Sequence, residues 1–187
     1  MDPIHYQPIV NKPREIHPSG AFAATCVDII DLGMRVKDFK GVKSAAHTIA
    51  LVFSTGKTSS EGFALDVSQE FTMSLSDKSK LKPFLEGWRG KAFTAEEKGS
   101  SFDIVKEFGN RNCFLNVVHK QSVDGQKTYA NIGAAMPLPE GMPAPKVNYK
   151  RAPYWATRKA EYAKEFEAYM RATPDEPEEQ ADERVPF

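Results

Sequence analysis

The sequence lacks any apolar run near the roughly 20 residues that a membrane-spanning helix needs. Its opening stretch, MDPIHYQPIVNKPREIHPSG, has no apolar core of the kind found in secretory signals. Only two cysteines are present, Cys26 and Cys113, and each lies in a separate apolar run, which favours small buried thiols over a disulfide or a metal site. We therefore expect a cytoplasmic protein without membrane association.

Recognisable catalytic patterns are also missing. The four histidines, His5, His17, His47 and His119, show no metal-like spacing with one another or with the cysteines. No Ser-His-Asp arrangement or carboxylate pair stands out, although residues distant in sequence can still assemble an active site. We predict no metal, no cofactor and no enzymatic activity.

One segment, STGKTSSEG, has part of a phosphate-binding loop pattern in Gly56-Lys57-Thr58. The complete pattern requires a glycine five residues before Gly56, where this chain has Leu51 inside an apolar run. A turn-rich connector with a solvated lysine is the better interpretation.

The formal net charge of the chain is zero, but the charged residues are unevenly distributed along it. Residues 174–187 carry six acids and one base, whereas residues 1–173 carry 24 bases and 19 acids. A mildly basic body with an acidic tail is typical of a polyanion-binding protein, although acidic tails also serve solubility alone.

Alternating apolar residues predict five strands, and a 3.6-residue period predicts two helices. The strands are expected at 20–33, 47–53, 63–75, 112–120 and 128–136, with a basic loop between the first two and a tight Asp124-Gly125 turn between the last two. The helices are expected at 81–88, with Ser79 as candidate N-cap, and at 155–171. On the second helix, Tyr162, Phe166, Tyr169 and Met170 form a stripe that fits either the protein's own sheet or a second subunit.

Three strands, a helix and a closing hairpin match the element order of an OB-fold, a five-stranded barrel. An SH3-like barrel or a small β-sandwich would give a similar order. We predict an extended arm at 1–19, an OB-fold domain at 20–139, a linker and helix at 140–173, and a disordered acidic tail at 174–187.

Cations and aromatic rings carry the remaining chemistry, because single-stranded nucleic acid is held by charges along its phosphates and by rings that stack on its bases. In an OB-fold, the loops between strands 1 and 2 and between strands 4 and 5 border the ligand. We expect Phe39 and Tyr129 to stack on bases, while Trp88 belongs to the core. The predicted cations are Arg35, Lys37, Lys40, Lys43, Lys57, Arg89, Lys91, Lys120 and Lys127.

The end of the chain, acids followed by Val185-Pro186-Phe187, resembles the tail of bacterial single-stranded DNA-binding proteins, which typically ends in Ile-Pro-Phe. Arg184 departs from that pattern, because an acid is usual there. The segments PSGAFAATCVDIIDLG, LKPFLEGWRGKAF and VVHKQSVDGQKTYANI also resemble bacteriophage and mobile-element proteins assigned to single-stranded DNA binding, over most of residues 18–139.

The resemblance implies a protein of a bacterial host cell that coats single-stranded DNA, with little sequence preference, during replication, recombination or repair. It also implies a tail that recruits partner proteins of those processes through Asp182, Glu183, Val185, Pro186 and Phe187. The alternatives are a strand-annealing or recombination-mediator protein, a nucleic-acid-processing enzyme, and an adaptor that binds no DNA.

Overall fold

Five antiparallel strands form one open sheet in the computed structural model, which describes residues 15–99 and 102–173. In chain order the strands are β1 (Gly20–Phe39), β2 (Val42–Ser54), β3 (Val67–Thr72), β4 (Asn112–Gln121) and β5 (Thr128–Met136). In space their order is β3-β2-β1-β4-β5, so that β3 and β5 are the edge strands. The four helices are α1 (Leu81–Arg89), α2 (Ala95–Gly99), α3 (Ile104–Phe108) and α4 (Tyr154–Ala172).

The long strand β1 joins the two halves of the sheet. Its first six residues pair with β4, from Gly20 opposite Val117 to Thr25 opposite Asn112. From Thr25 onward it pairs with β2. Register shifts between Cys26 and Asp28 and between Asp31 and Gly33 interrupt this second ladder. Such irregularities bend a strand, and here they change which side chains face each side of the sheet.

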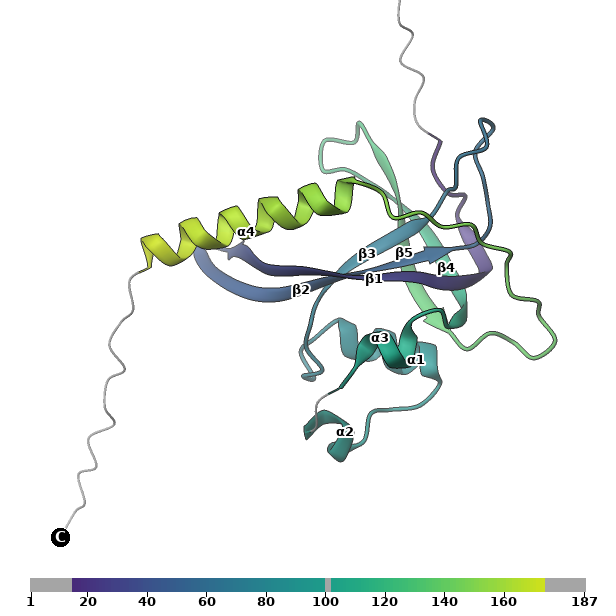
Figure 1. The fold of residues 1–187 in the computed structure, drawn as a ribbon, viewed down its shortest axis with the longest axis horizontal. Helices are drawn as coiled ribbons and strands as arrows, with labels where there is room; N and C mark the ends of the chain where they lie inside the picture. Colours follow the sequence, from purple (N-terminus) through teal and green to yellow (C-terminus); the bar gives the residue numbers. More distant parts are fainter. Residues whose placement is uncertain (1–14, 100–101, 174–187) are drawn as a thin grey trace, which may run out of the picture.

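The main core lies between one face of the sheet and the helices α1 and α3, which Figure 1 shows below the strands. Leu81, Leu85 and Trp88 of α1 are buried, as the i, i+4, i+7 spacing requires, and Trp88 is only 1% exposed. Cys26 and Cys113 are buried free thiols in the same cluster. The predicted core role of Trp88 is therefore confirmed.

Helix α4 covers the opposite face of the sheet (Figure 1). Trp155 and Tyr162 are buried against a second apolar cluster, whose strand residues are Ile30, Leu32, Ala50 and Val52. Tyr162 of the predicted stripe thus packs on the protein's own sheet. Met170, at the far end of the helix, remains 50% exposed.

The linker before α4 is tied to the sheet through Asp28. Tyr149 donates a hydrogen bond of 2.9 Å to this carboxylate, and Arg151 binds it through two nitrogens at 2.7 and 2.6 Å. Burial alone would raise the pKa of Asp28, but these hydrogen bonds outweigh burial and hold the pKa below its usual value. The carboxylate is therefore ionised at neutral pH and fixes the path of the chain into α4.

Several predicted boundaries differ from the structure. The basic segment 35–44 is not a loop, because β1 and β2 continue through it and Lys40-Gly41 forms the turn between them. The third strand is shorter than predicted, and Phe63 lies outside it with 68% exposure. Lys80 rather than Ser79 occupies the N-cap position of α1, although the Ser79 hydroxyl does accept the Leu81 N–H at 3.1 Å.

The sheet is open in the described structure, so the mainly β fold with its C-terminal helix is confirmed, whereas the five-stranded OB-fold barrel stays a prediction. The acidic tail at 174–187 and residues 1–14 of the predicted arm lie outside the described residues. The predicted partner-binding residues also lie outside the described residues; they are Asp182, Glu183, Val185, Pro186 and Phe187.

Candidate nucleic-acid interface

The predicted basic segment forms the free end of the β1–β2 hairpin. Lys40 and Gly41 turn the chain with φ angles of 55° and 83°, and the Asp38 carboxylate accepts the Gly41 N–H at 2.9 Å. The Phe39 ring is 73% exposed, and the Lys40 ammonium lies 5.5 Å from its centroid. Lys43, the register partner of Asp38, is exposed on β2. The hairpin end thus combines an unburied aromatic ring with two lysines.

Two further predicted cations lie on the same face of β1 as Phe39, since alternate residues of a strand share a face. The Arg35 guanidinium contacts Glu70 of β3 at 3.0 Å and lies 5.1 Å from the centroid of the Tyr162 ring of α4. The Lys37 ammonium donates a hydrogen bond to the Thr72 hydroxyl. The Arg35 side chain is therefore fixed by contacts within the protein, whereas the Lys37 ammonium, which has three N–H donors, has further donors available for a ligand.

The β4–β5 hairpin carries three of the predicted residues. Lys120 is the register partner of Tyr129, whose side chain is 49% exposed. The turn that follows Lys120 is fixed by the Ser122 hydroxyl, which accepts the Lys127 N–H at 3.0 Å. The Asp124 carboxylate accepts the Gln126 N–H at 3.1 Å in the same turn. This hairpin therefore also presents an exposed ring between two lysines.

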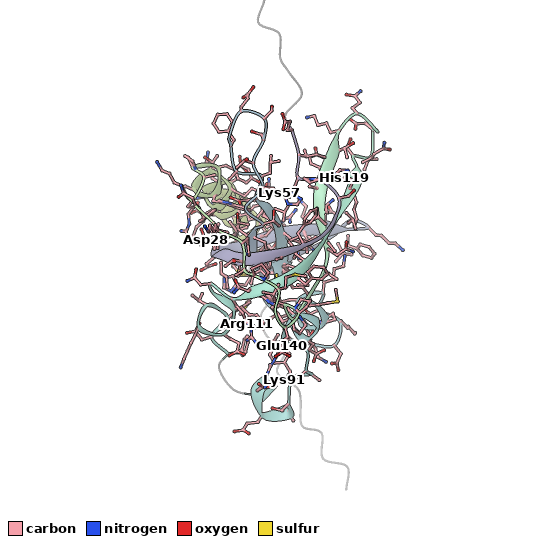
Figure 2. The ribbon with its side chains drawn as sticks, turned by 90° about the vertical axis from the view of Figure 1, so that its right-hand side faces the viewer. Asp28, Lys57, Lys91, Arg111, His119 and Glu140 are labelled. Carbon is pink, nitrogen blue, oxygen red and sulfur yellow. The ribbon has the colours of Figure 1, made fainter. Side chains whose placement is uncertain are left out.

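Lys57 lies in the β2–β3 connection, where its ammonium sits 5.9 Å from the centroid of the Phe22 ring. Next to it, the buried His17 imidazole contacts the Thr55 hydroxyl at 2.6 Å, and His119 donates to the His17 carbonyl at 2.8 Å. Figure 2 shows Lys57 and His119 at the same end of the molecule. Through these hydrogen bonds, the segment around His17 links the β2–β3 connection to β4.

Two predicted DNA contacts are placed differently from the rest. The Arg89 side chain is 3% exposed, pairs with Glu97 of α2 at 2.6 Å and lies 4.5 Å from the Phe93 ring centroid. The Arg89 guanidinium therefore supports the α1–α2 connection and, unlike the other predicted DNA contacts, is not presented on the surface. Lys91 is exposed, but it lies at the end of the molecule opposite Lys57 (Figure 2).

The structure thus gathers the predicted residues within each hairpin, not into one continuous patch. Arg35, Lys37, Phe39, Lys40 and Lys43 share the β1–β2 hairpin, and Lys120, Lys127 and Tyr129 share the β4–β5 hairpin. The two hairpins leave the sheet in different directions (Figure 1). A ligand that contacts both has to be extended and flexible.

Lys78 and Lys80, which precede α1, are not among the predicted DNA contacts. Together with Lys37 they line a groove of about 430 Å³ next to the end of β3. In the segment SDKSKLKP, the sequence-based prediction concerned Ser79 alone, as a helix cap. The sequence does indicate this groove, since two lysines lie directly before a predicted helix, and a helix N-terminus favours negative ligands.

A second hollow, of about 900 Å³, has the opposite charge. Three acids, Glu15, Glu61 and Asp66, and one base, Lys150, line it, together with Tyr149 and Trp155. Burial raises the pKa of Asp66, and its Oδ1 atom is buried without a hydrogen-bond partner in the described structure. This acidic hollow repels phosphate and is not part of the basic surfaces.

Across residues 15–99 and 102–173, no group of three His, Cys, Asp or Glu side chains is arranged to hold a metal ion. Within the same part of the chain, no helix has the length and apolar character needed to cross a membrane. Neither a comparison with protein-family models nor one with curated protein sequences finds a match for this chain.

Proposed function

We propose that this protein binds single-stranded DNA, which it coats and protects with little sequence preference during replication, recombination or repair. The observation that supports this best is repeated on both hairpins: an exposed ring, Phe39 or Tyr129, flanked by lysines. Rings stack on any base and lysines follow the phosphates, so this combination is suited to unpaired strands of any sequence.

The strand arrangement supports an OB-like fold as the framework for this function. β1 pairs with both β2 and β4, the edge strands β3 and β5 approach each other, and α1 follows β3 in the chain. OB-folds are partly open five-stranded barrels that bind oligonucleotides beside the loops joining strands 1–2 and 4–5. These are the two hairpins that carry the exposed rings.

We extend the proposal to partners and location on the basis of the sequence. The acids of residues 174–187 favour encounter with basic partner proteins, and Val185, Pro186 and Phe187 supply an apolar contact. The proposed partners are replication and recombination proteins in the cytoplasm of a bacterial host cell.

The direct test is titration of a fluorescent poly-dT oligonucleotide at two salt concentrations, with a duplex of equal length as control. We expect tight binding of the single strand alone, weakened by salt because bound counterions compete with lysines for phosphate. Equal binding of duplex and single strand, or no binding of either, contradicts the proposal.

Variants F39A and Y129A test whether the two rings take part. Loss of one stacked base costs about 1–3 kcal/mol, so each variant should bind roughly 5- to 150-fold more weakly. The matched control is F63A, which removes a ring of similar exposure, 68%, from the β2–β3 connection. If F39A and Y129A bind as F63A does, the rings are not the stacking platform.

A further inference from the structure

The groove beside α1 is built from three elements that are distant in sequence. Lys37 comes from the outer part of β1, Thr72 from the end of β3, and Ser76, Lys78 and Lys80 from the segment that leads into α1. The Lys37 ammonium donates to the Thr72 hydroxyl and so links β1 to β3 across the intervening strand β2. The groove is therefore part of the folded framework.

Positive charge in the groove is only partly balanced. Partial burial and the neighbouring charges of Arg35 and Lys80 lower the pKa of Lys37, and the Glu70 carboxylate offsets part of this effect. No ion pair or hydrogen bond is found for the Lys78 and Lys80 ammonium groups within the described residues. Like charges gathered in one hollow repel each other, and a bound anion relieves that repulsion.

The acids near the groove are already engaged. Glu70, which lines it, contacts Arg35 at 3.0 Å and Arg158 at 3.2 Å and accepts a hydrogen bond from Tyr162 at 2.7 Å. Asp77, next to Lys78 in the chain, pairs with Lys82. Glu70 also acts on Lys37, so the charge of this carboxylate is shared between Arg35, Arg158 and Lys37 and offsets the positive charge of the groove only in part.

The N-terminus of α1 adds a second favourable feature. The helix has nine residues and begins at Leu81, directly after the groove residue Lys80. Backbone N–H groups of a first helical turn lack partners within the helix, and the helix dipole is positive there. Ser79 accepts one of these N–H groups, from Leu81, and Pro83 has none, which leaves Lys82 and Phe84 as the first-turn N–H donors; no acid lies in this turn. Such a helix end favours a bound anion.

We propose that this groove binds a backbone phosphate of the single strand, with Lys37, Lys78 and Lys80 as its cations. The inference rests on the proposed function and adds a phosphate site to it. Lys37 and Phe39 lie two residues apart on one face of β1, which places them about 7 Å from each other along the strand. A strand whose base stacks on Phe39 therefore passes the groove within one or two nucleotides.

The test compares K78A/K80A with the control double variant K106A/K164A, which removes the same charge from exposed positions on α3 and α4. Binding of poly-dT is measured at several salt concentrations, and circular dichroism checks that each variant is folded. Each lost phosphate contact reduces the slope of log K against log salt by about 0.7, so K78A/K80A, which disrupts the one phosphate site of the groove, should lower it by up to about 0.7. The control should leave the slope close to that of the wild type.

Each outcome is informative. If the wild-type protein binds poly-dT and K78A/K80A matches the control, the groove is not a phosphate site, while the proposed function stands. If the wild-type protein binds no single strand, both proposals fail.

A titration with inorganic phosphate at constant ionic strength, followed by amide NMR signals of residues 72–82, separates a strand phosphate from a free anion. Signals that respond to poly-dT at concentrations far below those needed for inorganic phosphate support the proposal. Saturation by inorganic phosphate with no response to poly-dT overturns it.

Discussion

Replacement of Trp155 by alanine tests how α4 is held on the sheet. Trp155 is 7% exposed and packs with Tyr162 on the outer face of β1 and β2. A buried tryptophan removes about 200 Å² from water, which at about 25 cal/mol per Å² gives an upper bound near 5 kcal/mol. Large-to-small replacements of this kind cost about 3–5 kcal/mol, so we expect W155A to lose most of the docking energy of α4.

The loss of stability in W155A should be confined to the docking of α4 on the sheet. The main core, which contains Trp88 and Phe53, forms a separate cluster on the other face of the sheet. Once α4 detaches, a further weakening of its contacts no longer lowers the stability of the rest of the protein. The free energy of global unfolding should therefore fall by no more than the docking energy of α4.

Native-state hydrogen exchange measures this directly. In W155A the amides of α4 should exchange at least about a hundredfold faster, because about 3 kcal/mol separates the two opening equilibria. Amides of β4 should keep their protection. The matched control is Y154A, which replaces the neighbouring aromatic residue, 53% exposed, and should change exchange less than tenfold. Equal exchange of α4 in W155A and Y154A would refute the reasoning.

Two other predictions concern charged groups. Burial lowers the pKa of His17 below its usual value, so the unfolded chain binds a proton more readily than the folded protein does. The contribution of His17 to stability should therefore be complete above about pH 6.5 and should be lost as the pH falls below it. In thermal melts, H17Q should lose less stability than the wild type between pH 7.5 and 5.5. E70Q removes the carboxylate charge that faces Arg35 and Arg158, and should cost about 1–2 kcal/mol in denaturant unfolding while it tightens poly-dT binding at low salt. An unchanged or weaker affinity of E70Q would show that these arginines do not influence the bound strand.

The sequence was most informative where a regular period met a clear turn signal. The strand predicted at 128–136 coincides with β5, because Asp124-Gly125 marks the preceding turn and the strand ends before Pro137. Helix α1 was predicted from its i, i+3, i+4, i+7 apolar spacing, and Gly90 ends it with a φ of 72°. At Gly90 a side chain would also meet Pro137 at 3.0 Å, so both space and backbone conformation require glycine there.

The basic segment was misassigned because its composition resembles a loop. Lysines, an aspartate and a glycine lie at 35–43, yet a hairpin that projects beyond the core needs no apolar face to pair its strands. The burial of Arg89 depends on Glu97, which is supplied by the short helix α2 and follows no period. The groove at Lys37, Lys78 and Lys80 depends on contacts between β1 and the segment before α1, which no local pattern encodes.

The division of β1 between two partners has a mechanical consequence. Within the described residues, the ladder that links the β1–β2–β3 meander to the β4–β5 hairpin consists of the six register pairs from Gly20–Val117 to Thr25–Asn112, and the two units also share the main apolar core. Force applied across this short seam should peel the two units apart before either one unravels. A covalent crosslink between β1 and β4, across the seam, would raise the force that the molecule withstands more than one placed within either unit.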